Sequence, residues 1–221
     1  ANAIGDRATS SGLMANAFGS QALSTAQSST AIGTVAQARG ENSIAMGTHQ
    51  RVTGANSGSI GYAGGFDATG ATGRGISGTH NPNATQVSGS GTYSVGNTNS
   101  NVTSNESGIF GNDNVIQAKE NVRVVGNKNT VSKAGNSSLK DVYITGHNNQ
   151  VDGASKLKDS KNLFVMGAAN KVGTELNGDK ALTITDSYVI GTNNTINTSN
   201  TASETTDPSN PATKVGKGFF I

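Results

Sequence analysis

The sequence predicts an all-β fold, a β-solenoid built from coils of 14 and more residues. Three observations support this prediction: glycines recur at a fixed interval, small and polar residues alternate between them, and the composition suits neither a helix bundle nor a large aliphatic core. Only 33% of the 221 residues are apolar and 14% are charged, whereas ordinary globular domains have about 45–50% and about 25%. Glycine, a poor helix former, supplies 30 residues.

The first repeat occupies residues 1–70, where a glycine recurs every 14 residues and each glycine follows a large apolar residue. A repeat of 14 residues is too short for a helix–turn–helix unit. It suits one solenoid coil, in which two strands of about five residues are joined by tight turns where glycine supplies a positive φ. The glycines are Gly5, Gly19, Gly33, Gly47 and Gly61, and the apolar residues are Ile4, Phe18, Ile32, Met46 and Ile60.

The two halves of each coil alternate differently. In the second half, small residues such as Ala22 and Ser24 have mostly polar neighbours, which is typical of a half-buried strand. In the first half neither face is polar, so that strand needs cover on both faces. The second strand of the coil covers only one face. We therefore expect the large apolar residues to pack on other copies of the chain, in an obligate oligomer.

A second, looser repeat occupies residues 94–197, where five copies follow the glycine with x-x-Asn-x-[Val/Ile]. Asparagine can bond neighbouring peptide groups in turns, so stacked coils would place these asparagines in a ladder. The glycines are Gly96, Gly111, Gly126, Gly146, Gly167 and Gly191, and the apolar residues expected to pack in the core or between chains are Val95, Phe110, Val125, Met166 and Ile190. The asparagines are Asn114, Asn129, Asn149, Asn170 and Asn194.

Several segments depart from the repeat. Residues 71–93 are rich in Gly, Ser and Thr and are expected to be either a flexible decoration or a hairpin excursion. Residues 198–221 are expected to form a polar loop and an apolar end that docks on a missing neighbour. Insertions of growing length are expected to leave the solenoid at one edge as a row of loops: Gln117–Asn121, Ser132–Asp141, Asp152–Asn162 and Gly173–Asp186.

A family resemblance follows from the copies ANAIGDRATSSG, ANAFGSQALSTA, STAIGTVAQARG and SIAMGTHQRVTG. They resemble the head repeats of trimeric autotransporter adhesins, the YadA-like head, closely over residues 1–70 and loosely over 94–196. The resemblance implies a left-handed parallel β-roll, a homotrimer, and export through the outer membrane to the bacterial cell surface. The family's neck, coiled-coil stalk and membrane anchor have no match here, and we expect residues 198–221 to lead towards them.

Candidate binding residues lie in the departures from the repeat. Lys156, Lys158 and Lys161 cluster in one insertion, as a solvated loop or as a basic contact patch that a trimer would triple. Arg74 and His80 lie in the 71–93 interruption, with the same two interpretations. No catalytic, cofactor-binding or metal site is expected, because the three histidines are scattered and no nucleophile, zinc or phosphate-loop motif occurs.

Composition and motifs narrow the function classes. The absence of cysteine excludes a disulfide scaffold. A membrane span is not expected, because the sequence has no run of about 18 apolar residues. Nucleic-acid binding is not expected either, because the 16 basic and 14 acidic residues nearly balance and no basic stripe occurs. The chain begins without an export signal and is expected to be a mature fragment. We expect an adhesin head that binds host matrix proteins, receptors or other bacteria. A passive spacer is the main alternative, and a β-helix acyltransferase, with its longer coils, is disfavoured.

Overall fold

The computed structural model describes residues 1–62, 86–100, 102–152, 157, 159–173, 183–196 and 219–220. The regular elements among these residues are β-strands, and no helix occurs there that could cross a membrane. The predicted all-β class is therefore confirmed. The chain divides into two compact units, Ala1–Asp113 and Asn114–Ile221.

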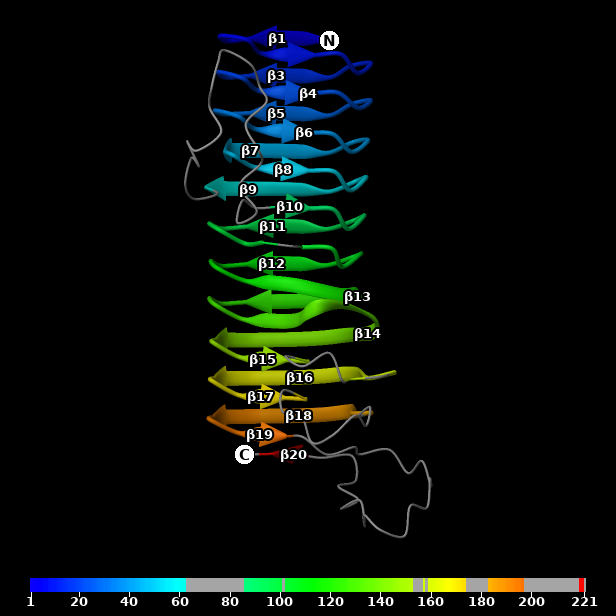
Figure 1. Cartoon of the computed structure of the whole chain (residues 1–221), viewed down its shortest axis with the longest axis vertical. Coiled ribbons are helices and arrows are strands. Elements are labelled where there is room, and N and C mark those ends of the chain that lie inside the picture. Colours follow the sequence, from blue (N-terminus) through cyan, green and yellow to red (C-terminus); the bar gives the residue numbers. More distant parts are fainter. Residues whose placement is uncertain are drawn as a thin grey trace. The chain divides into compact units, whose positions relative to one another are not determined.

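In the first unit, parallel strands stack coil upon coil in two sheets (Figure 1). Register pairs such as Ala31 with Ala45 show the 14-residue period. The longer strands are β1 (Asn2–Ile4), β3 (Asn16–Phe18), β5 (Thr30–Ile32), β7 (Ile44–Thr48), β9 (Gly58–Tyr62), β11 (Tyr93–Val95) and β12 (Gly108–Phe110). The short strands are β2 (Thr9–Ser10), β4 (Leu23–Ser24), β6 (Gln37–Ala38), β8 (Arg51–Val52) and β10 (Gln86–Val87).

The interior of the first unit is lined mainly by small side chains, because the two strands of one coil lie close together. Ala17, Ala31 and Ala45 are fully buried on the longer strands. Some buried hydroxyl groups are paired with the backbone: the Ser24 hydroxyl donates to the Ser29 carbonyl at 2.8 Å. The second half of each coil is thus the half-buried strand that the alternation predicted.

The turn glycines occupy backbone that other residues rarely adopt, with φ between 115° and 146°. Steric crowding gives a second reason for glycine, because a Cβ atom on Gly33 would lie 2.4 Å from the carbonyl oxygen of Gly47 in the next coil. This φ range covers Gly5, Gly19, Gly33, Gly47, Gly61, Gly96, Gly111, Gly126, Gly146, Gly167 and Gly191.

The second unit has the same parallel stacking but longer strands and a more aliphatic core (Figure 1). Ile116, Val131 and Val151 line one side of the interior and Val124 and Ile144 the other, and all are buried. The long strands are β13 (Val115–Val125), β14 (Thr130–His147), β16 (Lys161–Ala168) and β18 (Thr185–Thr192), and the short ones are β15 (Gln150–Val151), β17 (Lys171–Val172) and β19 (Thr195–Ile196).

The first two insertions are not loops, contrary to prediction. Gln117–Asn121 lies inside β13 and Ser132–Asp141 inside β14. These segments pair with each other, Ala118 with Asn136 and Glu120 with Lys140, and register shifts absorb their unequal lengths. Pairing satisfies backbone groups that a projecting loop would leave to water, so the extra residues lengthen the coil.

The later insertions are described only in part. Leu157 is buried, and its backbone N–H donates to the Asp152 carboxylate at 2.8 Å. Ile184 is also buried, and its N–H donates to the Ser160 hydroxyl at 2.9 Å. The described ends of both insertions therefore pack on the coils, and residues 153–156, 158 and 174–182 lie outside the described part.

Two other expectations need correction. Within the predicted 71–93 interruption, β10 pairs with β8 and Tyr93 begins β11, which pairs with β9, so residues 86–93 rejoin the stack. Residues 71–85 lie outside the described part. At the chain end, β20 (Phe219–Phe220) pairs with β18 of the same chain, because the edge of β18 offers it unpaired backbone groups. The apolar end therefore docks on its own chain and not on a missing neighbour.

The predicted asparagine ladder is confirmed. Asn149 is fully buried; its Nδ2 donates to Asn129 Oδ1 at 3.0 Å and to the Gly167 carbonyl at 2.9 Å. Its own Oδ1 accepts the N–H of Asn170 at 3.1 Å. In the first unit, Asn99 bonds the Gly111 carbonyl in the same way, although the motif misses Asn99 because its valine comes one residue later, at Val102.

Replacing Gly33 by alanine is expected to destabilise the fold. The φ of +119° costs about 1–3 kcal/mol for a residue with a Cβ atom, and the contact with the Gly47 carbonyl adds to this. Thermal unfolding followed by circular dichroism measures the loss. The control is Gly91→Asn, since Gly91 has φ +65°, which asparagine tolerates, and its nearest atom is 3.7 Å away. Equal melting temperatures for both variants would contradict the steric argument.

Replacing Asn149 by alanine is expected to cost about 1–3 kcal/mol for each buried partner left unsatisfied. The affected groups are the Gly167 carbonyl and the N–H groups of Asn170. Denaturant unfolding measures the change, with Gln150→Ala as the control because Gln150 is only half-buried on the neighbouring short strand. The control should stay within about 0.5 kcal/mol of the parent. A similarly small effect for Asn149→Ala would mean that the ladder adds no stability.

Candidate functional site

The outward face of the longer strands carries a column of apolar residues, each directly before a turn glycine. Strand alternation places Ala45 inside and Met46 outside, so a single chain leaves the column outside its core. Exposure reaches 63% at Ile4 and Phe110. We call this set the apolar column: Ile4, Phe18, Ile32, Met46, Ile60, Val95, Phe110, Val125, Met166 and Ile190.

The column is broken at one place in the second unit. Thr145 stands directly before Gly146, and the residue before it, Ile144, is buried and 2% exposed. Phe18, Ile32, Val95 and Ile190 are half-buried by their neighbours, and the other members of the column are exposed. Exposed apolar side chains gathered on one face of a sheet are typical of interfaces between proteins.

An aromatic ladder lies beside the column in the second unit. The rings of Tyr143, Phe164 and Tyr188 stack in sequence, with centroids 4.7 Å apart and planes inclined by 8° at both contacts. This spacing matches the distance between paired strands. Sequence reasoning missed the ladder, although each ring lies three residues before a turn glycine and alignment on the glycines would have found it.

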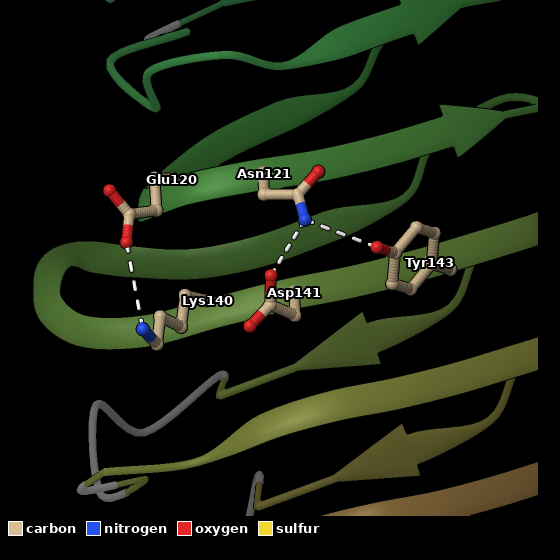
Figure 2. Close-up of polar contacts among 5 residues, drawn as sticks. All are labelled: Glu120, Asn121, Lys140, Asp141 and Tyr143. Carbon is tan, nitrogen blue, oxygen red and sulfur yellow. Dashed lines mark hydrogen bonds and ion pairs between the residues drawn. The ribbon is translucent and has the colours of Figure 1, made fainter.

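Lys161 is the candidate binding residue that the structure describes, and it lies at a turn edge of the second unit. It is exposed at the start of β16, and the N–H of Lys140 bonds the carbonyl of its neighbour Ser160 at 3.2 Å. Lys140 in turn forms an ion pair with Glu120 at 3.7 Å (Figure 2). Both partners are partly exposed, so the pair contributes about 0–1 kcal/mol.

Amide and carboxylate side chains accompany this ion pair. Asn121 Nδ2 donates to Asp141 Oδ1 at 2.6 Å and to the Tyr143 hydroxyl at 3.1 Å (Figure 2). Asn162 and Asp186 repeat the amide–carboxylate bond at 2.7 Å. Asn121, Asp141, Asn162 and Asp186 also share a positive φ of 49–55°. These contacts link successive coils at the positive-φ positions, and they leave the polar groups of this edge largely engaged with one another.

The other candidate binding residues, Arg74, His80, Lys156 and Lys158, lie outside the described residues. Of the predicted lysine cluster, the structure describes Lys161 alone. Across the described ranges, no three His, Asp or Glu side chains gather where they could hold a metal ion. The described surface offers apolar and polar contact faces, and no set of residues there indicates catalysis.

Comparison with known proteins identifies the repeat. Residues 24–49 match the YadA head domain repeat in two copies. This segment runs from β4 to the turn after β7 and contains the glycine positions Gly33 and Gly47. No curated protein matches the chain. The chain therefore carries YadA head repeats, and its resemblance to the YadA-like head domain of trimeric autotransporter adhesins is confirmed.

Proposed function

We propose that this chain is the head of a cell-surface adhesin, which attaches bacteria to host extracellular matrix, host cells or other bacteria by multivalent non-covalent binding. The observation that carries the proposal is the pair of YadA head repeats at residues 24–49, which belong to a regular stack of 14-residue coils. The proposed location is the bacterial cell surface, reached by export through the outer membrane.

The proposed assembly is a homotrimer of left-handed β-rolls in which the apolar column faces the partner chains. The exposure of Ile4, Ile60 and Phe110 in a single chain supports this, because burying such side chains is worth about 1.5–3 kcal/mol each. A cyclic arrangement would bury the column of every chain at once and leave the short strands and turns facing outward.

The proposed receptor contacts lie in the segments that depart from the repeat, with Arg74, His80, Lys156, Lys158 and Lys161 as candidate contact residues. Surface segments can vary without disturbing the paired coils that carry them. Trimer symmetry would present each segment three times, and linked contacts can raise apparent affinity about 10²–10⁴-fold. The alternative is a passive spacer, which would have the same stack without a receptor.

The trimer is tested by Ile32→Asp. Ile32 is half-buried on the outward face of β5, and a carboxylate buried there at a trimer interface would destabilise it by several kcal/mol in each chain. Sedimentation velocity should show a trimeric parent and a dissociated or unfolded variant. Thr25→Asp, which adds the same charge on the exposed outward side after β4, should remain trimeric. A folded monomer of the parent chain would refute the proposed assembly.

The adhesive function is tested by screening the trimer against matrix proteins and whole cells, beside variants shortened between Tyr62 and Gln86, between Asp152 and Asp159, and between Gly173 and Thr183. The paired insertions in β13 and β14 stay intact, so the coils should remain folded. Attachment is expected to fall with each change and most in the combined variant. If the combined variant is folded and attaches as well as the parent, the receptor contacts lie on the coils and not in the shortened segments. A parent that attaches to nothing would favour the spacer.

A further inference from the structure

Two arginines lie close together on the outward face of the short strands of the first unit. Along β6 and β8 the inward residues are Ala38 and Val52, both fully buried. Alternation therefore turns Arg39 and Arg51 outward. The N–H of Arg39 donates to the Val52 carbonyl at 2.8 Å. Ala38 pairs with Val52, so Arg39 lies one residue after this pair on β6 and Arg51 one residue before it on β8.

Neither guanidinium has a compensating negative charge in the part of the chain that the structure describes. Among the described residues, no carboxylate lies within ion-pair distance of Arg39 or Arg51. Within the same ranges, the Nε atom of Arg51 is buried and has no hydrogen-bond acceptor, so the neighbouring protein does little to stabilise this guanidinium.

The charges of the two arginines act on each other. Partial burial lowers the pKa of Arg39, and the nearby positive charge of Arg51 lowers it further. Even a lowered arginine pKa keeps the group charged at neutral pH. Two adjacent positive charges, with no carboxylate at ion-pair distance among the described residues, therefore favour the binding of an anion.

The neighbours of the pair are uncharged and can form hydrogen bonds. Gln37 flanks Arg51 on the adjacent strand, as the register pair shows. Thr53 is exposed two residues after Arg51. The outward residues of β2, β4, β6 and β8 include no acidic and no aromatic side chain.

We propose that Arg39 and Arg51 bind the sulfate groups of a sulfated glycan, while Gln37 and Thr53 bind its hydroxyl groups. Guanidinium forks match tetrahedral oxyanions through paired hydrogen bonds, and amide and hydroxyl side chains suit sugar hydroxyls. Single-stranded nucleic acid fits less well, because its binding uses aromatic stacking platforms that this face lacks. The site lies on the short strands of the coils, whereas the apolar column lies on the longer strands.

The test uses the full chain and a heparin-derived octasaccharide in isothermal titration calorimetry at low ionic strength. The parent is expected to bind, and raising the salt concentration should weaken binding. The double variant Arg39→Gln/Arg51→Gln should bind at least about tenfold more weakly, an effect that calorimetry resolves. Arg7→Gln, which removes an exposed arginine of the first coil, is the matched control and should bind like the parent.

A second variant protects the test against a folding defect. Arg39→Lys/Arg51→Lys keeps both charges but loses the planar fork, so it should bind more weakly than the parent and more tightly than the glutamine variant. Circular dichroism identifies the variants that are folded. If the glutamine variant unfolds, the lysine variant is the test: weaker binding than the parent supports the proposal, and equal binding contradicts it.

The proposal would be overturned if the parent did not bind the octasaccharide, or if Arg7→Gln lost as much affinity as the double glutamine variant. It would also be overturned if the parent bound a desulfated octasaccharide or a single-stranded oligonucleotide as tightly as the sulfated octasaccharide. Loss of octasaccharide binding upon shortening the segments outside the coils would also overturn it, because the site would then lie elsewhere. This readout separates the glycan site from attachment through those segments.

Discussion

Close contact between the backbones of successive coils is the constraint on which each stack depends. A Cβ atom on Gly5 would lie 2.4 Å from the carbonyl oxygen of Gly19, and one on Gly47 only 1.8 Å from that of Gly61. Glycine permits this approach, and the approach holds the strands on either side of the turn in register. Equivalent residues then lie side by side, as Ile32 and Met46 do, so side chains of one kind form columns.

The two units fill the interior of this backbone in different ways. Three residues after the turn glycine, the first unit places Ala22 and Ala36, whereas the second places Asn129 and Asn149. The asparagines bond glycine carbonyls and each other at the turn, before the point where the coils differ in length. The ladder therefore holds coils in register even where 20 or more residues separate its members.

The same stacking gives the outer surface two sides of different chemical character. The outward side of the longer strands carries the apolar column, which suits contact with partner chains, while the outward side of the short strands is mostly polar and contains the Arg39–Arg51 pair. Turns between the strands are free to differ between coils. A rigid stack can thus combine association, ligand contact and variation on separate faces, which is the physical basis for proposing an adhesin head.

The sequence by itself determined the strand class, the 14-residue period, the glycine positions and the asparagine ladder, because each appears as a column at a fixed offset from a glycine. Only the tertiary structure decided what depends on pairing between coils. The extra residues in β13 and β14 were predicted to be loops because the sequence does not show that they pair with each other. The pairing of β20 with β18 likewise appears only in the structure. Arg39 and Arg51 are brought together across coils although their separation in sequence differs from the repeat period, so the repeat could not predict that they meet.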